Sequence, residues 1–217
     1  MAAGSAPGWA VGALGVVCLL LLSDFISCDP QVIYGAVGNN VTLHVLKEKP
    51  FKEIVWKRGK DKVVEWDDKS DVKAFLSFKD RVHLDTDSGN LTIFHLTASD
   101  EDMYSIESPS VRNNSMFTLK VIEPLKELVL SCTLNGGNIT MSCTLMEDPD
   151  RHEDLVQYSW DCPPTIQCQG GSVSSEVYVS RESDLSQEVH CTVSNPLFKR
   201  IASVTLSTCV PQAPVVW

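Results

Sequence analysis

The chain has 217 residues, of which 18 are basic and 28 acidic, so its formal net charge is -10, and it contains eight cysteines. This length accommodates one large domain or two of about a hundred residues each. The acidic balance argues against a nucleic-acid-binding protein, which needs a basic face to neutralise phosphates. Eight cysteines are unusual in a reducing compartment and ordinary in secreted modules, so the composition also argues against a cytosolic protein.

The amino-terminal segment has the pattern of an export signal. Residues 11–22 read VGALGVVCLLLL, an uninterrupted apolar run that is followed by SDFISC. The run is shorter than the roughly 20 residues that span a bilayer, but it suits the apolar region of a signal peptide. We therefore predict a signal peptide over residues 1–28, cut after Cys28. The mature chain then enters an oxidising compartment with six cysteines.

Four Asn-x-Ser/Thr sequons and the carboxyl terminus also indicate where the protein is located. Asparagines at the sequons are Asn40, Asn90, Asn113 and Asn138, and four of them in an exported chain predict a glycoprotein. Residues 211–217 form a short tail with neither a spanning helix nor a glycolipid-anchor signal. We expect an extracellular protein, secreted as written, or one at the plasma-membrane surface if a longer form carries an anchor.

The first half of the mature chain, residues 29–123, predicts a sandwich of β-strands. Runs rich in Val, Ile, Thr and Phe recur every eight to twelve residues between turn signals, at 32–37, 40–45, 53–57, 61–66, 81–85, 91–96 and 116–122. No segment keeps a helical period for three turns. Alternation in the 53–57 run places Ile54 and Trp56 on one face and Glu53, Val55 and Lys57 on the other.

The second half, residues 124–210, repeats this plan after a linker that Pro124 marks. Its predicted strands lie at 125–132, 138–143, 156–162, 175–180, 188–193 and 202–209. All six cysteines of the mature chain lie in this half, and six cysteines allow fifteen pairings. A zinc site is the competing interpretation, which we disfavour because an exported chain oxidises its thiols and the 162–168 spacing does not match paired Cys-x-x-Cys ligands.

Several residues match the two kinds of immunoglobulin domain. In the first half, a tryptophan, an arginine, an aspartate and a tyrosine resemble the variable-type pattern, in which Arg pairs with Asp and Tyr packs at a strand corner: Trp56, Arg81, Asp100 and Tyr104. The cysteine usual two residues after this tyrosine is replaced by Ile106. In the second half, Cys143, Trp160 and Cys191 resemble the constant-type spacing. That resemblance implies the pairs Cys143 with Cys191, Cys132 with Cys209, and Cys162 with Cys168.

A variable-type domain without cysteines followed by a constant-type domain with extra disulfides resembles the family of T-cell antigen CD-two and the signalling lymphocyte activation molecules. The runs KEIVWK, RVHLDT, SDEDMY and YSWDCP carry this resemblance. The resemblance implies an all-β adhesion ligand with two tandem immunoglobulin-like sandwiches. It also implies that the first domain binds a receptor of the same family on T cells and natural killer cells and promotes cell contact and T-cell co-stimulation.

The resemblance assigns receptor contact to the sheet face of the first domain that contains strands C, C' and F. The matching positions here are Glu53, Lys57, Arg58, Lys60, Asp61, Lys62, Glu65, Phe75 and Lys79. Asn113 stands where the family's face carries an acidic side chain, and a glycan there would crowd a receptor, so we leave it out of this set.

The charges of the first domain support this assignment. Residues 29–123 carry 13 basic and 16 acidic side chains, whereas residues 124–210 carry 5 and 11, so the basic residues are concentrated in the first domain. Most charge runs are merely solvated strands. Here, however, Glu53 and Lys57 point outward with Val55, and Phe75 is available as an exposed anchor because Phe78 is the better core candidate.

Other classes of function find little support. The five histidines are scattered, and the chain has no Gly-x-Ser-x-Gly elbow, His-Glu-x-x-His motif or phosphate-binding glycine loop. The Asp100-Glu101-Asp102 run lacks the glycine and terminal glutamate of a calcium loop. We therefore expect no enzyme, cofactor, metal or small-molecule substrate. Two alternatives remain: a soluble decoy or regulatory form of the ligand, and a homophilic adhesion receptor, although we expect self-association to be weak or absent.

Overall fold

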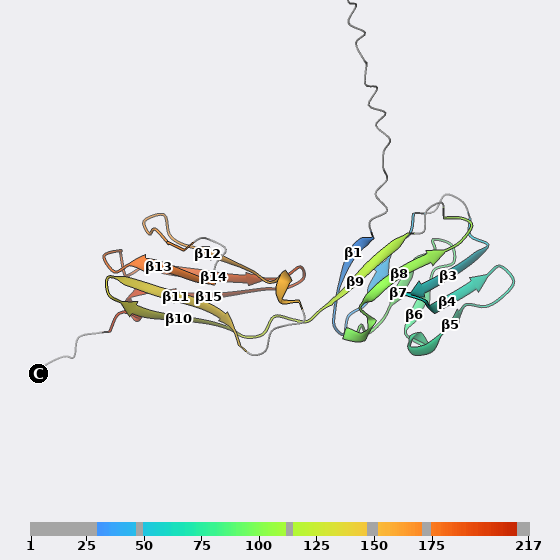
Figure 1. Cartoon of the computed structure of the whole chain (residues 1–217), viewed down its shortest axis with the longest axis horizontal. Coiled ribbons are helices and arrows are strands. Elements are labelled where there is room, and N and C mark those ends of the chain that lie inside the picture. The colour runs from blue at the N-terminus through green and yellow to red at the C-terminus, as the bar shows by residue number, and fades with distance from the viewer. Residues whose placement is uncertain (1–29, 47–49, 112–114, 147–151, 171–174, 212–217) are drawn as a thin grey trace, which may run out of the picture.

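The computed structural model describes residues 30–46, 50–111, 115–146, 152–170 and 175–211. Regular structure in these ranges consists of β-strands and short 3₁₀ turns, which form two sandwiches arranged end to end (Figure 1). The predicted signal peptide, Asn113 and most of the carboxyl-terminal tail lie outside the described residues. In the described part of the chain, no helix is long and apolar enough to cross a membrane.

The first domain packs a six-stranded sheet on a three-stranded one. Sheet order in the larger sheet is β1-β9-β8-β3-β4-β5, with bounds Gln31–Ala36, Met116–Ile122, Asp102–Glu107, Glu53–Arg58, Asp61–Asp67 and Lys73–Ala74. The smaller sheet has the order β2-β7-β6, with bounds Val41–Leu43, Leu91–Ile93 and Val82–Leu84. β1 pairs with β9 in parallel, and the other pairs are antiparallel. The two additional strands β4 and β5 beside β3 make this a variable-type immunoglobulin domain.

Aliphatic side chains fill the position of the absent inter-sheet disulfide. Leu43 on β2 and Ile106 on β8 are fully buried in one cluster with Trp56. The indole Nε1 of Trp56 donates to the carbonyl of Gly89 at 3.0 Å, so its polar atom has a partner within the core. Burial of Trp56 and Ile54, together with the outward position of Glu53, matches the predicted alternation of β3.

An ion pair closes one end of this sandwich. Both terminal nitrogens of Arg81 donate to the Asp100 carboxylate, at 3.0 and 2.8 Å, and Thr97 donates its N–H and its hydroxyl to the same carboxylate. Burial of Asp100 raises its pKa, but these donors prevail and hold that pKa below its ordinary value. The Tyr104 hydroxyl donates to the Asp100 carbonyl at 2.7 Å, the bond of a tyrosine corner, and burial raises the pKa of Tyr104.

The second domain is a sandwich of two three-stranded sheets. One has the order β10-β11-β13, with bounds Leu128–Asn135, Asn138–Leu145 and Glu176–Ser180. The other has the order β12-β14-β15, with bounds Gln157–Asp161, Glu188–Ser194 and Lys199–Thr205. Three disulfides join Cys132 to Cys209, Cys143 to Cys191, and Cys162 to Cys168. Cys143 on β11 and Cys191 on β14 are fully buried, and their disulfide joins the two sheets. This arrangement is that of a disulfide-rich, constant-type immunoglobulin domain.

Most predicted strands differ from the observed ones by a few residues at their ends, and two of these differences have a clear structural cause. The strand predicted at 202–209 ends at Thr205, and a 3₁₀ turn, η4 at Leu206–Cys209, brings Cys209 to Cys132. The strand predicted at 91–96 ends at Ile93, because His95 has a φ of 52° and turns the chain. Both differences arise at strand ends, where tertiary contacts decide the backbone path.

Residues 123–127 connect β9 to β10 and pass between the domains (Figure 1). Leu125 is 2% exposed, so the connection is packed rather than solvated. Two side chains of the second domain donate to its carbonyls: Asn195 Nδ2 to Glu123 at 3.5 Å and Arg200 Nε to Leu125 at 3.2 Å. The linker is therefore held by the second domain.

Candidate receptor-binding face

The outer face of the large sheet in the first domain gathers charged side chains from neighbouring strands. Because strand side chains alternate and directly paired residues share a face, the register assigns this surface residue by residue. Val55 on β3 pairs with Glu65 on β4 and Glu107 on β8, and Lys57 pairs with Lys62 and Ser105. Glu65 also pairs with Lys73 on β5. We call this surface the charged face; it comprises Glu53, Lys57, Lys62, Glu65, Asp67, Lys73, Phe75 and Glu107.

Ion pairs connect these strands across the charged face. Lys57 Nζ lies 2.7 Å from Glu107 Oε1, and Lys62 Nζ lies 2.6 Å from Glu65 Oε2. Lys73 Nζ lies 3.9 Å from the other Glu65 oxygen. The charges are partly exposed, so each pair contributes about 0 to 1 kcal/mol to stability. Such pairs are exchangeable, and they leave a surface on which positive and negative groups alternate.

Phe75 lies at the edge of this network, just after β5. The Nζ atoms of Lys62 and Lys73 lie 5.7 and 5.0 Å from the centre of its ring, which is the range of cation–π contact. The Phe75 side chain is half-buried, whereas Phe78 is 1% exposed and belongs to the core. The following residue, Leu76, is 63% exposed. The face therefore combines an aromatic side chain and an aliphatic one with its charges.

Four of the predicted contact residues lie outside this cluster. Arg58 points to the core side of the sheet, because it pairs with the buried Tyr104, and its guanidinium lies 5.0 Å over the Phe78 ring and donates to the Ser99 carbonyl at 3.1 Å. Asp61 pairs with Arg58 and shares its side. The other two are exposed elsewhere, Lys60 in the β3–β4 turn and Lys79 after η1, the turn at Leu76–Phe78. The family resemblance had grouped Arg58 with these contact residues, and strand alternation places it on the other side of the sheet.

Three residues of the charged face, Asp67, Lys73 and Glu107, are absent from the sequence-based set. Asp67 was detectable, because it follows Glu65 by two positions on β4 and strand side chains alternate. Glu107 was detectable, because Tyr104 and Ile106 are inward and the alternation of β8 then places Met103, Ser105 and Glu107 outward. Lys73 had no such signal, since β5 has two residues and its pairing with β4 depends on the folded chain.

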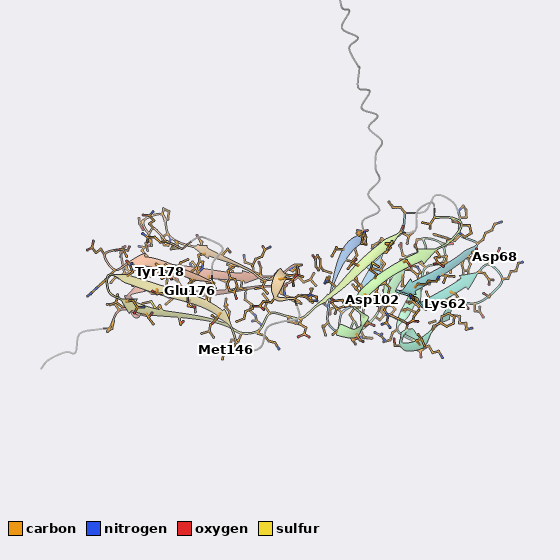
Figure 2. All side chains as sticks on the ribbon, in the orientation of Figure 1. Lys62, Asp68, Asp102, Met146, Glu176 and Tyr178 are labelled. Atoms are coloured by element: carbon orange, nitrogen blue, oxygen red, sulfur yellow. A yellow bond between two sulfur atoms is a disulfide. The ribbon has the colours of Figure 1, made fainter. Side chains whose placement is uncertain are left out.

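The charged face lies away from the linker. Figure 1 shows β3, β4 and β5 on the side of the first domain that is farther from the second domain, and Figure 2 labels Lys62 on this side. The sheet surface nearest the second domain is formed instead by β1 and β9. A partner approaching the charged face is therefore not obstructed by the second domain.

Two of the three predicted glycosylation sites of the first domain adjoin the opposite sheet, and the third, Asn113, lies outside the described residues. Asn40 and Asn90 directly precede β2 and β7 of the three-stranded sheet. The carboxamide oxygen of Asn40 accepts the His95 N–H at 3.1 Å, and that of Asn90 accepts the Val45 N–H at 2.9 Å. These bonds orient each side chain on the sheet that does not carry the charged face. Asn138 begins β11 in the second domain.

In the ranges that the structure describes, no group of three or more His, Cys, Asp or Glu side chains is placed to hold a metal ion. The geometry shows a mixed-charge sheet face on the first of two tandem immunoglobulin domains. Such a fold defines a protein of the immunoglobulin superfamily with two tandem domains.

Comparison with known proteins agrees with this class. Human lymphocyte function-associated antigen 3 is 49% identical over 213 residues, covering 98% of this chain and 84% of the relative, and human CD48 antigen is 31% identical over 183 residues, covering 78% and 72%. The family model for the lymphocyte function-associated antigen 3 C-terminal domain matches residues 130–210. A crystal structure of the CD2-binding domain of CD58, lymphocyte function-associated antigen 3, is similar with a TM-score of 0.65 and 31% identity, covering 81% of this chain and 96% of that one.

The chain belongs to the family of lymphocyte function-associated antigen 3. It is an immunoglobulin-superfamily adhesion ligand and not an enzyme.

Proposed function

We propose that the first domain binds an immunoglobulin-superfamily receptor on T cells and natural killer cells through the charged face, and thereby promotes cell contact and T-cell co-stimulation. The observation that carries this proposal is the charged face itself: lysines and glutamates from four neighbouring strands, with Phe75 held among them. The similar solved structure is described as a CD2-binding domain, and a receptor of that kind is the partner we propose.

The position of the sequons supports the choice of face. Glycans on Asn40 and Asn90 would cover the three-stranded sheet of the first domain, because both asparagines adjoin its strands. These two glycans leave the larger sheet as the protein surface that a receptor can reach, provided that Asn113 carries no glycan that crowds this sheet. This arrangement favours a contact through β3, β4, β5 and β8.

The internal ion pairs predict a weak and rapidly reversible contact. Lys57 and Lys62 already have carboxylate partners within the chain, so a receptor carboxylate exchanges one partner for another and adds little net free energy. Complementary charge then contributes to the rate of encounter and to specificity more than to affinity. Weak contacts suit adhesion, since many of them act together between two cell surfaces and avidity replaces affinity.

Substitutions on the charged face test the proposal directly. Binding of the two-domain chain to T cells, measured with and without a reagent that blocks the receptor, should weaken about tenfold for Phe75→Ala. An aromatic anchor that a partner covers commonly contributes more than 1 kcal/mol. Lys62→Ala should weaken the same blockable binding about threefold to tenfold. Far-ultraviolet circular dichroism should show an unchanged fold in both variants.

Lys199→Ala is the matched control for these substitutions, because Lys199 is an exposed lysine on β15 of the second domain. It should bind like the parent chain. If Phe75→Ala and Lys62→Ala both bind normally, or if Lys199→Ala weakens binding as much as they do, the charged face is not the receptor site.

Ionic strength should act mainly on association. Raising the salt concentration from about 50 to 500 mM screens charges more than a few ångströms apart, so the association rate constant should fall about threefold to tenfold, with a smaller change in the dissociation rate. Surface plasmon resonance on immobilised receptor would measure both constants. Association that does not depend on salt would contradict the electrostatic part of the proposal.

The charged face carries both signs, which raises the alternative of homophilic pairing. We propose that self-association is weak, because Glu65 and Glu107 are already paired with lysines of the same chain. Sedimentation of the two-domain chain should show a monomer at micromolar concentration. A dimer that the Lys62→Glu substitution dissociates would favour the homophilic alternative. The separate alternative of a soluble decoy would be contradicted by a transcript that continues into an apolar segment.

A further inference from the structure

One sheet of the second domain presents hydroxyl groups to solvent. Alternation on β11 and β13 turns the aliphatic side chains into the core, so the residues between them point outward. Cross-strand pairing extends this outer surface over β10. We call it the hydroxyl face; it comprises Ser131, Thr133, Thr140, Ser142, Thr144 and Tyr178. The three strands contain no lysine or arginine, and Glu176 is their one acidic residue. The receptor-binding proposal uses none of these residues.

Tyr178 is the largest side chain of the hydroxyl face, and it is 38% exposed (Figure 2). Its N–H donates to the Gln169 carbonyl at 2.7 Å, and its carbonyl accepts the Gln169 N–H at 2.8 Å. Because both backbone groups point toward Gln169, Tyr178 and its other partner, Thr140, form a pair without hydrogen bonds between them. Side chains lie closest in pairs of this kind. The aromatic ring therefore stands beside Thr140 on the surface.

Asn138, the first residue of a sequon, lies on the same surface as Tyr178. Asn138 is exposed, and the next residue, Ile139, is fully buried, so Asn138 and Thr140 both point outward. Asn138 pairs with Ser180, which makes Tyr178, two residues earlier, its diagonal neighbour across β11 and β13. Diagonal neighbours are about 7 to 8 Å apart, a distance that an aromatic side chain spans. An exposed tyrosine is ordinary on a strand, but this one adjoins a glycan attachment site.

The sugar that links an N-glycan to asparagine, β-linked N-acetylglucosamine, has chemistry that matches this surface. Its axial C–H bonds make one side of the ring apolar, and its hydroxyl and amide groups lie around the rim. The electron-rich face of an aromatic ring attracts such C–H groups. Serine and threonine hydroxyls both donate and accept hydrogen bonds, as the rim of a sugar requires. The hydroxyl face thus fits a neutral carbohydrate.

We propose that the first sugar of a glycan on Asn138 stacks on the Tyr178 ring, and that the glycan then lies along the hydroxyl face. The sugar is covalently tethered beside its binding surface, so the contact forms at a high effective concentration. Pairing of β11 with β13 brings Asn138 and Tyr178 together, and the contact therefore exists in the folded domain alone. A contact of this kind stabilises the second domain, because the unfolded chain does not make it.

Calorimetric unfolding of the full two-domain glycoprotein tests this contact. The chain would be made in mammalian cells that add high-mannose glycans, and mass spectrometry would measure the occupancy of Asn138. Asn138→Gln keeps the amide but prevents attachment, and it should lower the transition midpoint of the second domain by about 4 °C. In a Tyr178→Ala background, the same substitution should change the midpoint by less than about 1 °C. Endoglycosidase H, which leaves the first sugar in place, should preserve the midpoint of the parent chain.

Two control backgrounds and a spectroscopic measurement make the outcome specific. Tyr178→Phe keeps the ring, and Ile201→Ala removes an exposed apolar side chain from β15 of the other sheet, so Asn138→Gln should have its full effect in both. In nuclear magnetic resonance spectra of the trimmed glycoprotein, the ring current of Tyr178 should shift the C–H protons of the first sugar upfield, and Tyr178→Ala should abolish this shift. The proposal is overturned if Asn138 carries no glycan, if Asn138→Gln has the same effect with and without Tyr178, or if trimming to the first sugar removes the stabilisation.

Discussion

Asp100→Ala is expected to lower the free energy of unfolding of the first domain by about 3 kcal/mol, because removing one partner of a buried pair leaves the other uncompensated. Arg81 would lose both of its carboxylate bonds, and two donors of Thr97 would lose their acceptor. For a domain of this size, that loss corresponds to a transition midpoint about 15 °C lower. Differential scanning calorimetry of the two-domain chain would measure the first-domain transition.

Asp102→Ala is the matched control, since Asp102 is an exposed aspartate only two residues away on β8 (Figure 2). The free energy of unfolding of Asp102→Ala should lie within about 0.5 kcal/mol of the parent value. Its transition midpoint should therefore change far less than that of Asp100→Ala. The difference between the two variants should shrink in acid. Because the pKa of folded Asp100 is depressed, its stabilisation is present above the ordinary aspartate pKa and lost as pH falls through the folded value. Equal midpoints for the two variants at neutral pH would refute the structural role of this pair.

Loss of the Cys143–Cys191 disulfide should have a large effect on the stability of the second domain. The bond joins residues 48 apart in sequence, and both cysteines are fully buried between the sheets. The chain-entropy model assigns about 4 kcal/mol to a loop of this length, and typical measured losses are about 2 to 5 kcal/mol. The double variant Cys143→Ala/Cys191→Ala should therefore unfold at much lower denaturant concentration in equilibrium titrations monitored by circular dichroism.

The Cys162–Cys168 disulfide provides the comparison. It closes a loop with a sequence separation of 6, for which the same model gives about 2 kcal/mol, and both cysteines are only partly buried. Cys162→Ala/Cys168→Ala should accordingly cost about half as much stability. Equal losses in the two double variants would show that the loop-length argument does not describe this domain.

Much of the fold was predictable from local patterns. Strand alternation placed Ile54 and Trp56 inward, and the combination of Arg81, Asp100 and Tyr104 indicated a variable-type domain whose missing disulfide is replaced by Ile106 and its neighbours. These features depend on side-chain periodicity and spacing, which the linear chain carries. The strand ends at Ile93 and Thr205 were less predictable, because a single turn residue or a disulfide partner decides where each strand stops.

The sequence indicated which strands carry the candidate site, but not the full set of residues that lie on it. The concentration of basic residues in the first domain and the family resemblance indicated β3 and β4, which carry most of the charged face, and Phe78 was correctly preferred to Phe75 as a core residue. The sequence did not show that Arg58 turns to the Phe78 side, nor that Lys73 joins Glu65. Whether a residue near a turn lies on one face or the other depends on strand register, and register is set by pairing between distant segments.

Composition, spacing and alternation by themselves determined that this is an exported, all-β protein of two immunoglobulin-like domains, because these properties are local and repeat along the chain. Only the tertiary structure decided which charges share a face, which of them are already paired, and where the domains touch. Lys57 and Glu107 are 50 residues apart, and Glu101 and His152 are 51 apart. Contacts at such separations arise from cross-strand pairing and domain docking, for which a linear pattern carries no signal.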